Sequence, residues 1–117
     1  MIHLDPDRRE EAIEAGWEAH AEQFNGRRDL YDQGCDAWTV VAVCDGPKVI
    51  GALYAQNGVI HLGIIPEYRG KWASRRVIRD MLTYGHMTRI RDEAPEKIEF
   101  ATRLGFMAQG DTYVFCR

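Results

Sequence analysis

The stretch LGIIPEYRGKWASRRVIRDML, residues 62–82, joins the end of a strand to the start of a helix. The apolar run at residues 59–65 stops at Pro66, because proline cannot donate a hydrogen bond to a sheet ladder. Ser74 occupies the expected N-cap position, where its hydroxyl can accept from an unpartnered helical amide. Beyond Ser74, apolar side chains recur at the spacing of one helix face: Val77, Ile78, Met81 and Leu82.

Cationic side chains surround the predicted helix start: Arg69, Lys71, Arg75, Arg76 and Arg79. The whole chain has a formal net charge of −3, so this cluster is a local feature. The first amides of a helix lack partners, and the helix dipole places partial positive charge at the same end. The turn is therefore predicted to bind an anion, and a diphosphate would fit it.

The run PEYRGKWAS, residues 66–74, resembles the acetyl-CoA pyrophosphate loop of the GNAT superfamily of N-acetyltransferases, whose pattern is R/Q-x-x-G-x-G/A. Arg69 matches the first position of that pattern, whereas Trp72 and Ser74 replace its two glycines. A second run, FATRLGF at residues 100–106, resembles the helix-to-strand corner of the same family. Two motifs in the expected order strengthen the resemblance beyond either one alone.

The resemblance covers residues 37–117, while residues 1–36 match the family only by their helical pattern. The chain has 117 residues, of which 45% are hydrophobic and 28% charged, and it is predicted to form one domain, residues 1–117. The Arg-Gly-Lys-Trp form and the short length are most similar to GNAT proteins encoded by tailed phages and prophages. No apolar run approaches the roughly 20 residues that cross a bilayer, and residues 1–11 lack the character of a secretion signal.

The cysteines are Cys35, Cys44 and Cys116, and no two of them form a C-x-x-C pair. An odd number without that spacing argues against disulfides and against a zinc site. We therefore expect reduced thiols, no metal and a cytoplasmic location, in the host cell if the protein is phage-encoded. The negative net charge also disfavours general nucleic-acid binding.

Turn and capping residues divide the chain into elements of predicted type. The order is a helix, three antiparallel strands, a helix, a short strand, a helix and a hairpin. Their expected positions are residues 5–26, 38–44, 49–55, 59–65, 74–84, 87–91, 95–105, 106–109 and 112–116. This is the GNAT order without the usual first strand, of which residues 2–4 would be a vestige. The fold class is therefore predicted as mixed α/β, with a mostly antiparallel GNAT-like sheet flanked by helices.

The first helix is expected to begin with Asp5 as its N-cap and Pro6 at its first position. Residues 27–36 are predicted to form a short helix or turn. The resemblance implies that this region contacts the acceptor substrate, which makes Tyr31 a candidate specificity residue, and a solvated connector is the alternative. The apolar stripe of the first helix, with His20 packing at its margin, is Ile13, Trp17, His20, Ala21 and Phe24.

The resemblance also implies how acetyl-CoA would be held. Arg69 and Lys71 would add positive charge, and the main chain of Ile64 and Ile65 would pair with the pantetheine arm like an added strand. A backbone amide there would polarise the thioester carbonyl, so no special side chain is required. The pyrophosphate would be bound by the amides of Gly70, Lys71, Trp72, Ala73 and Ser74.

Trp72 is the largest departure from the family pattern, because glycine in such a loop lets phosphate approach the main chain closely. Either the indole points away, into the sheet or onto the adenine, or the loop has opened and binds weakly. The first interpretation is preferred because the flanking cations and Ser74 remain. Packing of Trp72 against the last hairpin is the purely structural form of the same interpretation.

Catalytic side chains are harder to assign. The family often places a tyrosine acid and a CoA-contacting asparagine where this chain has Ala101 and Ala94, so Tyr113 or Tyr84 would have to supply the acid. His61 has a suitable intrinsic pKa of about 6.5 and is the candidate base. Strand alternation, however, places His61 on the face opposite to the family's bases, and a half-buried structural histidine is the alternative. A water relay would require no base on the chain.

The predicted function is acetyl-CoA-dependent transfer of an acetyl group to an amine of a small molecule or a protein. The alternative is a catalytically impaired GNAT-fold phage accessory or structural protein that binds another protein, and Trp72, Ala94 and Ala101 motivate it. Nucleic-acid phosphate is a third and unfavoured ligand for the cationic cluster. The sequence indicates no membrane partner and assigns no oligomeric state.

Overall fold

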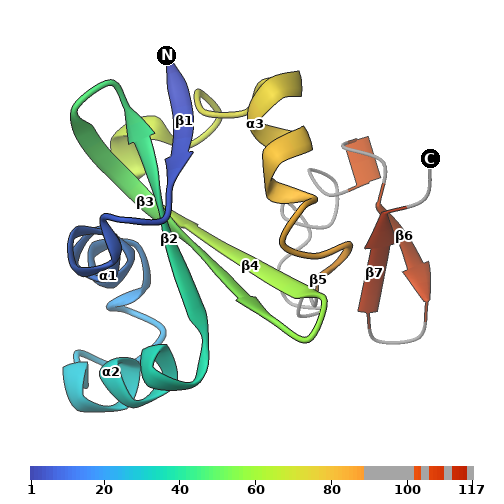
Figure 1. The fold of residues 1–117 in the computed structure, drawn as a ribbon. Helices are drawn as coiled ribbons and strands as arrows, with labels where there is room; N and C mark the ends of the chain where they lie inside the picture. Colours follow the sequence, from blue (N-terminus) through green and yellow to red (C-terminus); the bar gives the residue numbers. More distant parts are fainter. Residues whose placement is uncertain (89–101, 104–105, 110–111, 116–117) are drawn as a thin grey trace.

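The computed structural model describes residues 1–88, 102–103, 106–109 and 112–115. Its centre is a seven-stranded sheet in the order β1-β2-β3-β4-β5-β7-β6 (Figure 1). The strands are β1 Ile2–Asp5, β2 Thr39–Asp45, β3 Lys48–Gln56, β4 Val59–Ile64, β5 Met87–Thr88, β6 Phe106–Gln109 and β7 Thr112–Phe115. The helices are α1 Arg9–His20, α2 Arg28–Ala37, the 3₁₀ helix η1 Pro66–Tyr68 and α3 Arg75–Met81. The predicted mixed α/β class, with a mostly antiparallel sheet, is confirmed.

The hairpin between β3 and β4 turns at Asn57-Gly58, as predicted. Both residues have left-handed backbone angles, with φ of 49° and 81°. Two successive residues of this kind match the twist of a tight hairpin, and Asn-Gly adopts them at little cost. The turn sets the register of the pair, which runs from Gln56↔Val59 to Gly51↔Ile64.

A short first strand is present in the sheet. β1 pairs antiparallel with β2 from Ile2↔Asp45 to Asp5↔Ala42, so the predicted vestige is an edge strand of four residues. The expectation that Asp5 caps the first helix is wrong, because α1 begins at Arg9 without a side-chain cap. Instead, Oδ1 of Asp5 accepts from the amide of Asp7 at 2.9 Å and closes a turn after β1.

The first helix is shorter than predicted and ends at His20, after which turns carry the chain to Gly26. Its buried residues are the small Ala12, Ala15 and Gly16. Ile13, Trp17 and Phe24 of the predicted stripe are half-buried and pack at the margin of the core. Small residues on the buried side let this helix lie close to the sheet.

Helices cover both faces of the sheet (Figure 1). On one face, Tyr31 and Cys35 of α2 and Ala12 of α1 pack with Val40, Ala42, Ala52 and Tyr54. On the other face, Val77 and Met81 of α3 belong to a buried cluster with Val41, Val43, Leu53 and Ile60. Alternate residues of β2 therefore point to opposite layers, as strand geometry requires.

The Ser74 cap is confirmed, because its side-chain oxygen accepts from the amide of Val77 at 3.2 Å. The helix that follows, α3, ends at Met81 and not near residue 84. The predicted strand at residues 87–91 begins as β5, and β6 and β7 form the predicted last hairpin. Most of the predicted helix at residues 95–105 lies outside the described residues.

A pair of buried tyrosines links both helices of one face to the sheet. The Tyr31 hydroxyl donates to the carbonyl of Ile13 at 2.7 Å, and it lies 2.7 Å from the Tyr54 hydroxyl. Since Tyr31 has one proton to give, Tyr54 donates to Tyr31. Burial raises the pKa of both hydroxyls, which therefore stay protonated at ordinary pH.

Removing the hydroxyl of Tyr31 is expected to cost more stability than removing that of Tyr54. Tyr31→Phe strands the buried Tyr54 hydroxyl, which costs about 1–3 kcal/mol, whereas Tyr54→Phe loses one bond, worth about 0.5–1.5 kcal/mol. Urea unfolding of both single variants and the double variant measures the three free energies. A double variant that costs the full sum of the singles would contradict this coupling.

Candidate active site

Among the described residues, β4 and β5 pair only at the start of β4, and the edge of β4 beyond that pair is here called the gap. These parallel strands pair at Val59↔Met87, where the amides of His86 and Met87 both donate to the Gly58 carbonyl at 3.1 Å. β5 has two residues, whereas β4 continues to Ile64 (Figure 1). Within the part of the chain that the structure describes, the edge of β4 that faces away from β3 has no strand partner beyond this pair.

The hydrogen-bond pattern shows which main-chain groups face that open edge. The Ile65 amide donates to the Ile50 carbonyl at 2.9 Å, so Ile65 is bonded toward β3. Successive residues of a strand direct their main-chain groups to opposite sides, and those of Leu62 and Ile64 therefore face the gap. Of the two residues predicted to pair with pantetheine, Ile64 faces the gap and Ile65 does not. Leu62 was missed, although the two-residue turn at Asn57-Gly58 already fixes this alternation.

The loop after β4 is held by its own main chain and by the neighbouring hairpin. The amides of Tyr68, Arg69 and Lys71 donate to carbonyls three residues earlier, at 3.0, 3.3 and 2.9 Å. The Tyr68 hydroxyl donates to Oδ2 of Asp45 at 2.9 Å, and this bond raises the pKa of Tyr68. The loop is thereby attached to the turn between β2 and β3.

All but one of the residues expected to bind pyrophosphate are exposed. The exposed ones are Arg69, Gly70, Lys71, Ala73 and Ser74. Gly70 has a φ of 79°, and no heavy atom beyond its chain neighbours lies within 4 Å of the place where a side chain would begin. The amides of Gly70, Ala73 and Ser74 donate to no other main-chain group of the described residues. Outward amides beside cations make a suitable surface for an anion.

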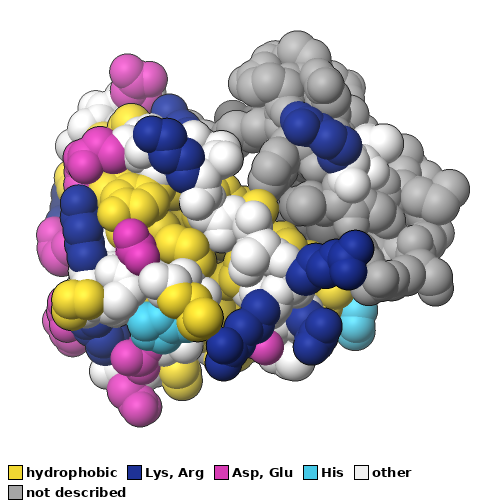
Figure 2. All heavy atoms as spheres, turned by 90° about the horizontal axis from the view of Figure 1, so that it is seen from above, with side chains coloured by type: hydrophobic (Ala, Val, Ile, Leu, Met, Phe, Trp, Pro, Cys, Tyr) yellow, Lys and Arg dark blue, Asp and Glu magenta, His cyan; other side chains and the backbone are white. Residues whose placement is uncertain are grey.

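The cationic side chains of the loop and α3 are also exposed: Arg69, Lys71, Arg75, Arg76 and Arg79. None of them forms an ion pair with a described residue. Two reach other elements, since Nη2 of Arg69 donates to the Ala19 carbonyl at 3.5 Å and Nη1 of Arg76 lies 3.4 Å from the Met1 sulfur. Figure 2 shows several Lys and Arg side chains gathered toward one end of this face, with most Asp and Glu toward the other.

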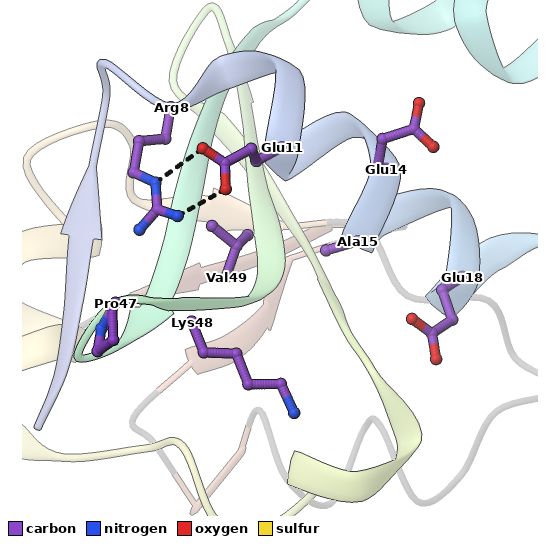
Figure 3. A pocket seen from close by; sticks show the side chains of 8 residues that line it. All are labelled: Arg8, Glu11, Glu14, Ala15, Glu18, Pro47, Lys48 and Val49. Carbon is purple, nitrogen blue, oxygen red and sulfur yellow. Dashed lines mark hydrogen bonds and ion pairs between the residues drawn. The ribbon is translucent and has the colours of Figure 1, made fainter.

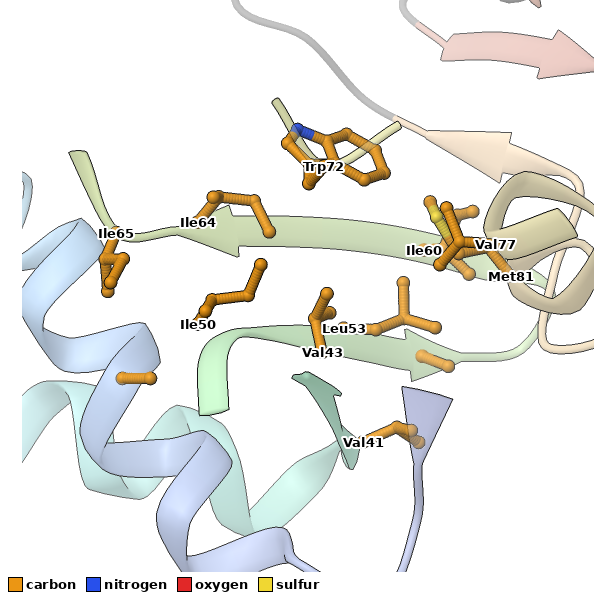
Figure 4. Packing of buried hydrophobic residues seen from close by; sticks show 12 residues of the cluster. Val41, Val43, Ile50, Leu53, Ile60, Ile64, Ile65, Trp72, Val77 and Met81 are labelled. Atoms are coloured by element: carbon orange, nitrogen blue, oxygen red, sulfur yellow. The ribbon is translucent and has the colours of Figure 1, made fainter. Parts of the chain in front are cut away.

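Trp72 is the exception, because its side chain is only 4% exposed. It belongs to the buried cluster that includes Ile64, Val77 and Met81, and the indole lies over β4 beside Ile64 (Figure 4). The interpretation that Trp72 points toward the sheet is therefore confirmed. The large side chain fills part of the core and leaves the outer surface of the loop open.

The candidate catalytic residues lie on different parts of the sheet. His61 is half-buried on the face of α1 and α2, and its ring centroid is 5.3 Å from that of Trp38. Tyr113 lies on β7 opposite Thr88 of β5, so its main chain is one strand beyond the gap. Tyr84 packs against the buried cluster that includes Val77 and Met81 of α3. The two alanines that replace family side chains, Ala94 and Ala101, lie outside the described residues.

A separate hollow of about 620 Å³ lies between α1 and the turn that joins β2 to β3 (Figure 3). Its charged lining residues are Arg8, Glu11, Glu14, Glu18 and Lys48. Arg8 bonds to Glu11 through Nη2 at 2.6 Å, which raises the pKa of Arg8 and lowers that of Glu11. None of the residues predicted for the cofactor or for catalysis lines this hollow.

Cys35 and Cys44 are buried, and burial raises the pKa of both thiols. Thiols of this kind are poor nucleophiles. Cys116 lies outside the described residues. In the described ranges, no three His, Cys, Asp or Glu side chains come together as a metal site would require. No described helix is both long enough and apolar enough to cross a membrane.

No family model matches the sequence, and no curated protein matches it. Solved structures match almost the whole chain. The apo form of YjaB from Escherichia coli aligns with a TM-score of 0.70 and 15% identity, covering 98% of this chain and 97% of that one. The PaiA N-acetyltransferase from Thermoplasma acidophilum, in complex with coenzyme A, aligns with a TM-score of 0.59 and 16% identity, covering 97% and 96%.

A chimera of the spermidine N-acetyltransferase SpeG from Vibrio cholerae and hSSAT aligns with a TM-score of 0.61 and 20% identity. That match covers 93% of this chain and 82% of the other. The chain therefore has the same fold as these structures, which include a putative acetyltransferase of the GNAT family, so its fold is the GNAT fold. The fold that the motif at residues 66–74 suggested is confirmed.

Replacing Trp72 is expected to destabilise the whole protein. Trp72→Ala removes a buried indole and should cost about 3–5 kcal/mol of unfolding free energy. Lys71→Ala, at the exposed preceding position, should change stability by no more than about 0.5 kcal/mol. Urea unfolding of the two variants gives the comparison, and equally small losses in both would contradict the core placement of the indole.

Proposed function

We propose that this chain is an acetyl-CoA-dependent N-acetyltransferase, which transfers an acetyl group from the thioester to an amine nitrogen. The observation that carries the proposal is the open edge of β4, which leads directly into an exposed cationic loop. One strand thus offers main-chain groups that pair with no other described strand and, just beyond its end, a surface for a diphosphate. The GNAT fold supports the proposal, since neighbours with this fold include N-acetyltransferases and one complex with coenzyme A.

Acetyl-CoA, the proposed cosubstrate, would be held mainly by main-chain groups. Leu62 and Ile64 would pair with the pantetheine arm as an added strand, because their amides and carbonyls face the gap. Ile65 and Trp72 would support the site from within the fold. The diphosphate would be bound by the exposed amides and cations of the loop: Arg69, Gly70, Lys71, Ala73 and Ser74. The open space at Gly70 suits a close approach of phosphate to the main chain.

Acetyl-CoA supplies the acetyl group already activated as a thioester. The chain would orient that group and polarise its carbonyl, since an amide of Leu62 or Ile64 can donate to an oxygen placed in the gap. Donors aimed at a developing oxyanion typically contribute about 10²–10³ in rate. From the sequence, His61 was the candidate base and Tyr113 the candidate acid; the place of His20 in the structure bears on the choice of base and is considered below.

The proposed acceptor is an amine, either of a small molecule or of a protein. One structural neighbour is a spermidine N-acetyltransferase chimera, which supports an amine as the acceptor class. The Arg-Gly-Lys-Trp form of the loop supports an origin in a tailed phage or prophage. The cytoplasm, of the host cell in that case, is the proposed location.

Acetyl-CoA binding to the purified protein tests the cofactor proposal. Isothermal titration should show binding that the Arg69→Ala, Lys71→Ala double variant weakens about tenfold or more, because two charge-assisted contacts to phosphate are lost. Arg27→Ala is the matched control, since Arg27 is exposed and pairs with Asp29 away from the loop. No heat at high micromolar acetyl-CoA with folded protein, or equal weakening in the control, would refute the assigned site.

Thiol release over a panel of amines and peptides tests the transferase activity itself. Release of CoA together with an acetylated product is the expected result, because a bound thioester beside an acceptor amine should react. The rival function is a GNAT-fold protein that acts only by binding another protein. Binding of acetyl-CoA without any release across the panel would favour that rival.

A further inference from the structure

Position 63 of β4 is a glycine whose side-chain space is occupied by α1. A Cβ at Gly63 would collide with Nε2 of His20, would lie 2.8 Å from Cδ2 of the same ring, and would lie 3.4 Å from the Ala19 Cβ. His20 is the last residue of α1. Its imidazole therefore lies directly against the main chain of β4.

Gly63 also lies between Leu62 and Ile64, the two residues whose main-chain groups face the gap. Ile64 packs in the cluster on the α3 face, so position 63 faces α1 and α2. The imidazole of His20 thus lies over the face of β4 opposite to α3, at the level of the two residues whose main-chain groups face the gap.

Two contacts fix the last turn of α1 in this place. The ring centroids of His20 and Tyr54 are 5.8 Å apart, and the Tyr54 hydroxyl is engaged with Tyr31. Nη2 of Arg69 donates to the Ala19 carbonyl at 3.5 Å, which joins α1 to the loop. Tyr54 of β3 therefore lies beside the His20 ring, and Arg69 of the loop bonds to the residue that precedes it.

We infer that His20, and not His61, accepts the proton of the acceptor amine during acetyl transfer; this inference rests on the proposed function. His61 lies two residues nearer to Val59↔Met87, where the gap is closed, and its ring packs beside Trp38. His20 contacts β4 where the strand is open. The tight fit at Gly63 holds its Nε2 over the face of β4, between the two residues whose main-chain groups border the gap.

The step balances with groups already named. The amine nitrogen attacks the thioester carbonyl carbon, so a nitrogen–carbon bond forms and the carbon–sulfur bond breaks, with its electron pair leaving on sulfur as CoA thiolate. The proton lost by the nitrogen goes to Nε2 of neutral His20. The imidazolium then gives that proton to water and becomes ready for another cycle.

Imidazole resonances of the full-length protein provide a test that needs no acceptor. With ¹³C-labelled histidine, added acetyl-CoA should shift the His20 ring signal more than that of His61, and should leave exposed His86 unchanged. The single variants His20→Gln, His61→Gln and His86→Gln assign the signals. A His61 shift with an unmoved His20 overturns the inference, whereas no shift of any backbone or side-chain signal refutes the proposed function itself.

Kinetics with any amine that the wild-type protein acetylates provide the second test. His20→Gln should lower kcat about 100-fold or more and change the KM for acetyl-CoA by no more than about twofold. The variant should also show a flatter pH profile of kcat/KM than the wild-type protein between about pH 5 and 8, because glutamine does not titrate there. His86→Gln is the matched control and should keep both the rate and the pH profile.

Circular dichroism separates a catalytic loss from unfolding of the variant. Added imidazole should restore part of the activity of folded His20→Ala, which a merely structural role would not produce. A folded His20→Gln that keeps its rate and pH profile overturns the inference while the transferase function stands. If His20→Gln does not fold, the folded His20→Ala variant takes its place in both tests; if no amine in the panel reacts, the transferase function fails and the inference fails with it.

Discussion

The separation of β4 from β5 is the constraint on which the rest of the candidate site depends. The two strands bond at Val59↔Met87, and β4 then runs on to Ile64 without a partner on that edge in the described chain. An unpaired strand edge is ordinarily a liability, because it can join another strand. Here helices cover both faces of the sheet and a charged loop follows at once, which suits the proposal that a narrow, amide-bearing ligand pairs with this edge.

The local parts of this arrangement were predictable from the sequence. Asn57-Gly58 permits one tight turn, and that turn fixes the register of β3 and β4. Ser74 caps α3 as its position suggests. Asp5 failed as a predictor because an Asp before a proline can close a turn as readily as it caps a helix. The outcome depended on the pairing of β1 with β2, which no local pattern contains.

The site was only partly readable, for physical reasons that differ between residues. The loop with Arg69 and Gly70 was proposed from its motif, and the strand alternation that directs the main chain of Leu62, and not that of Ile65, to the gap was present in the sequence but unused. The direction of Trp72 depends on how the core fills, which chain order does not reveal. The contact of His20 with Gly63 could not be predicted from local sequence, because it forms only when α1 packs against β4.

The contact between His20 and Gly63 couples two positions that are distant in the sequence, so that a substitution at one restricts what the other can be. A larger residue at position 63 has no room while an imidazole occupies position 20, and a smaller residue at position 20 would leave a void over the strand. Divergent copies of this chain should therefore alter both positions together or neither. Substitutions elsewhere on the solvent side of α1, such as at Glu18, are free of this restriction because that side chain is exposed.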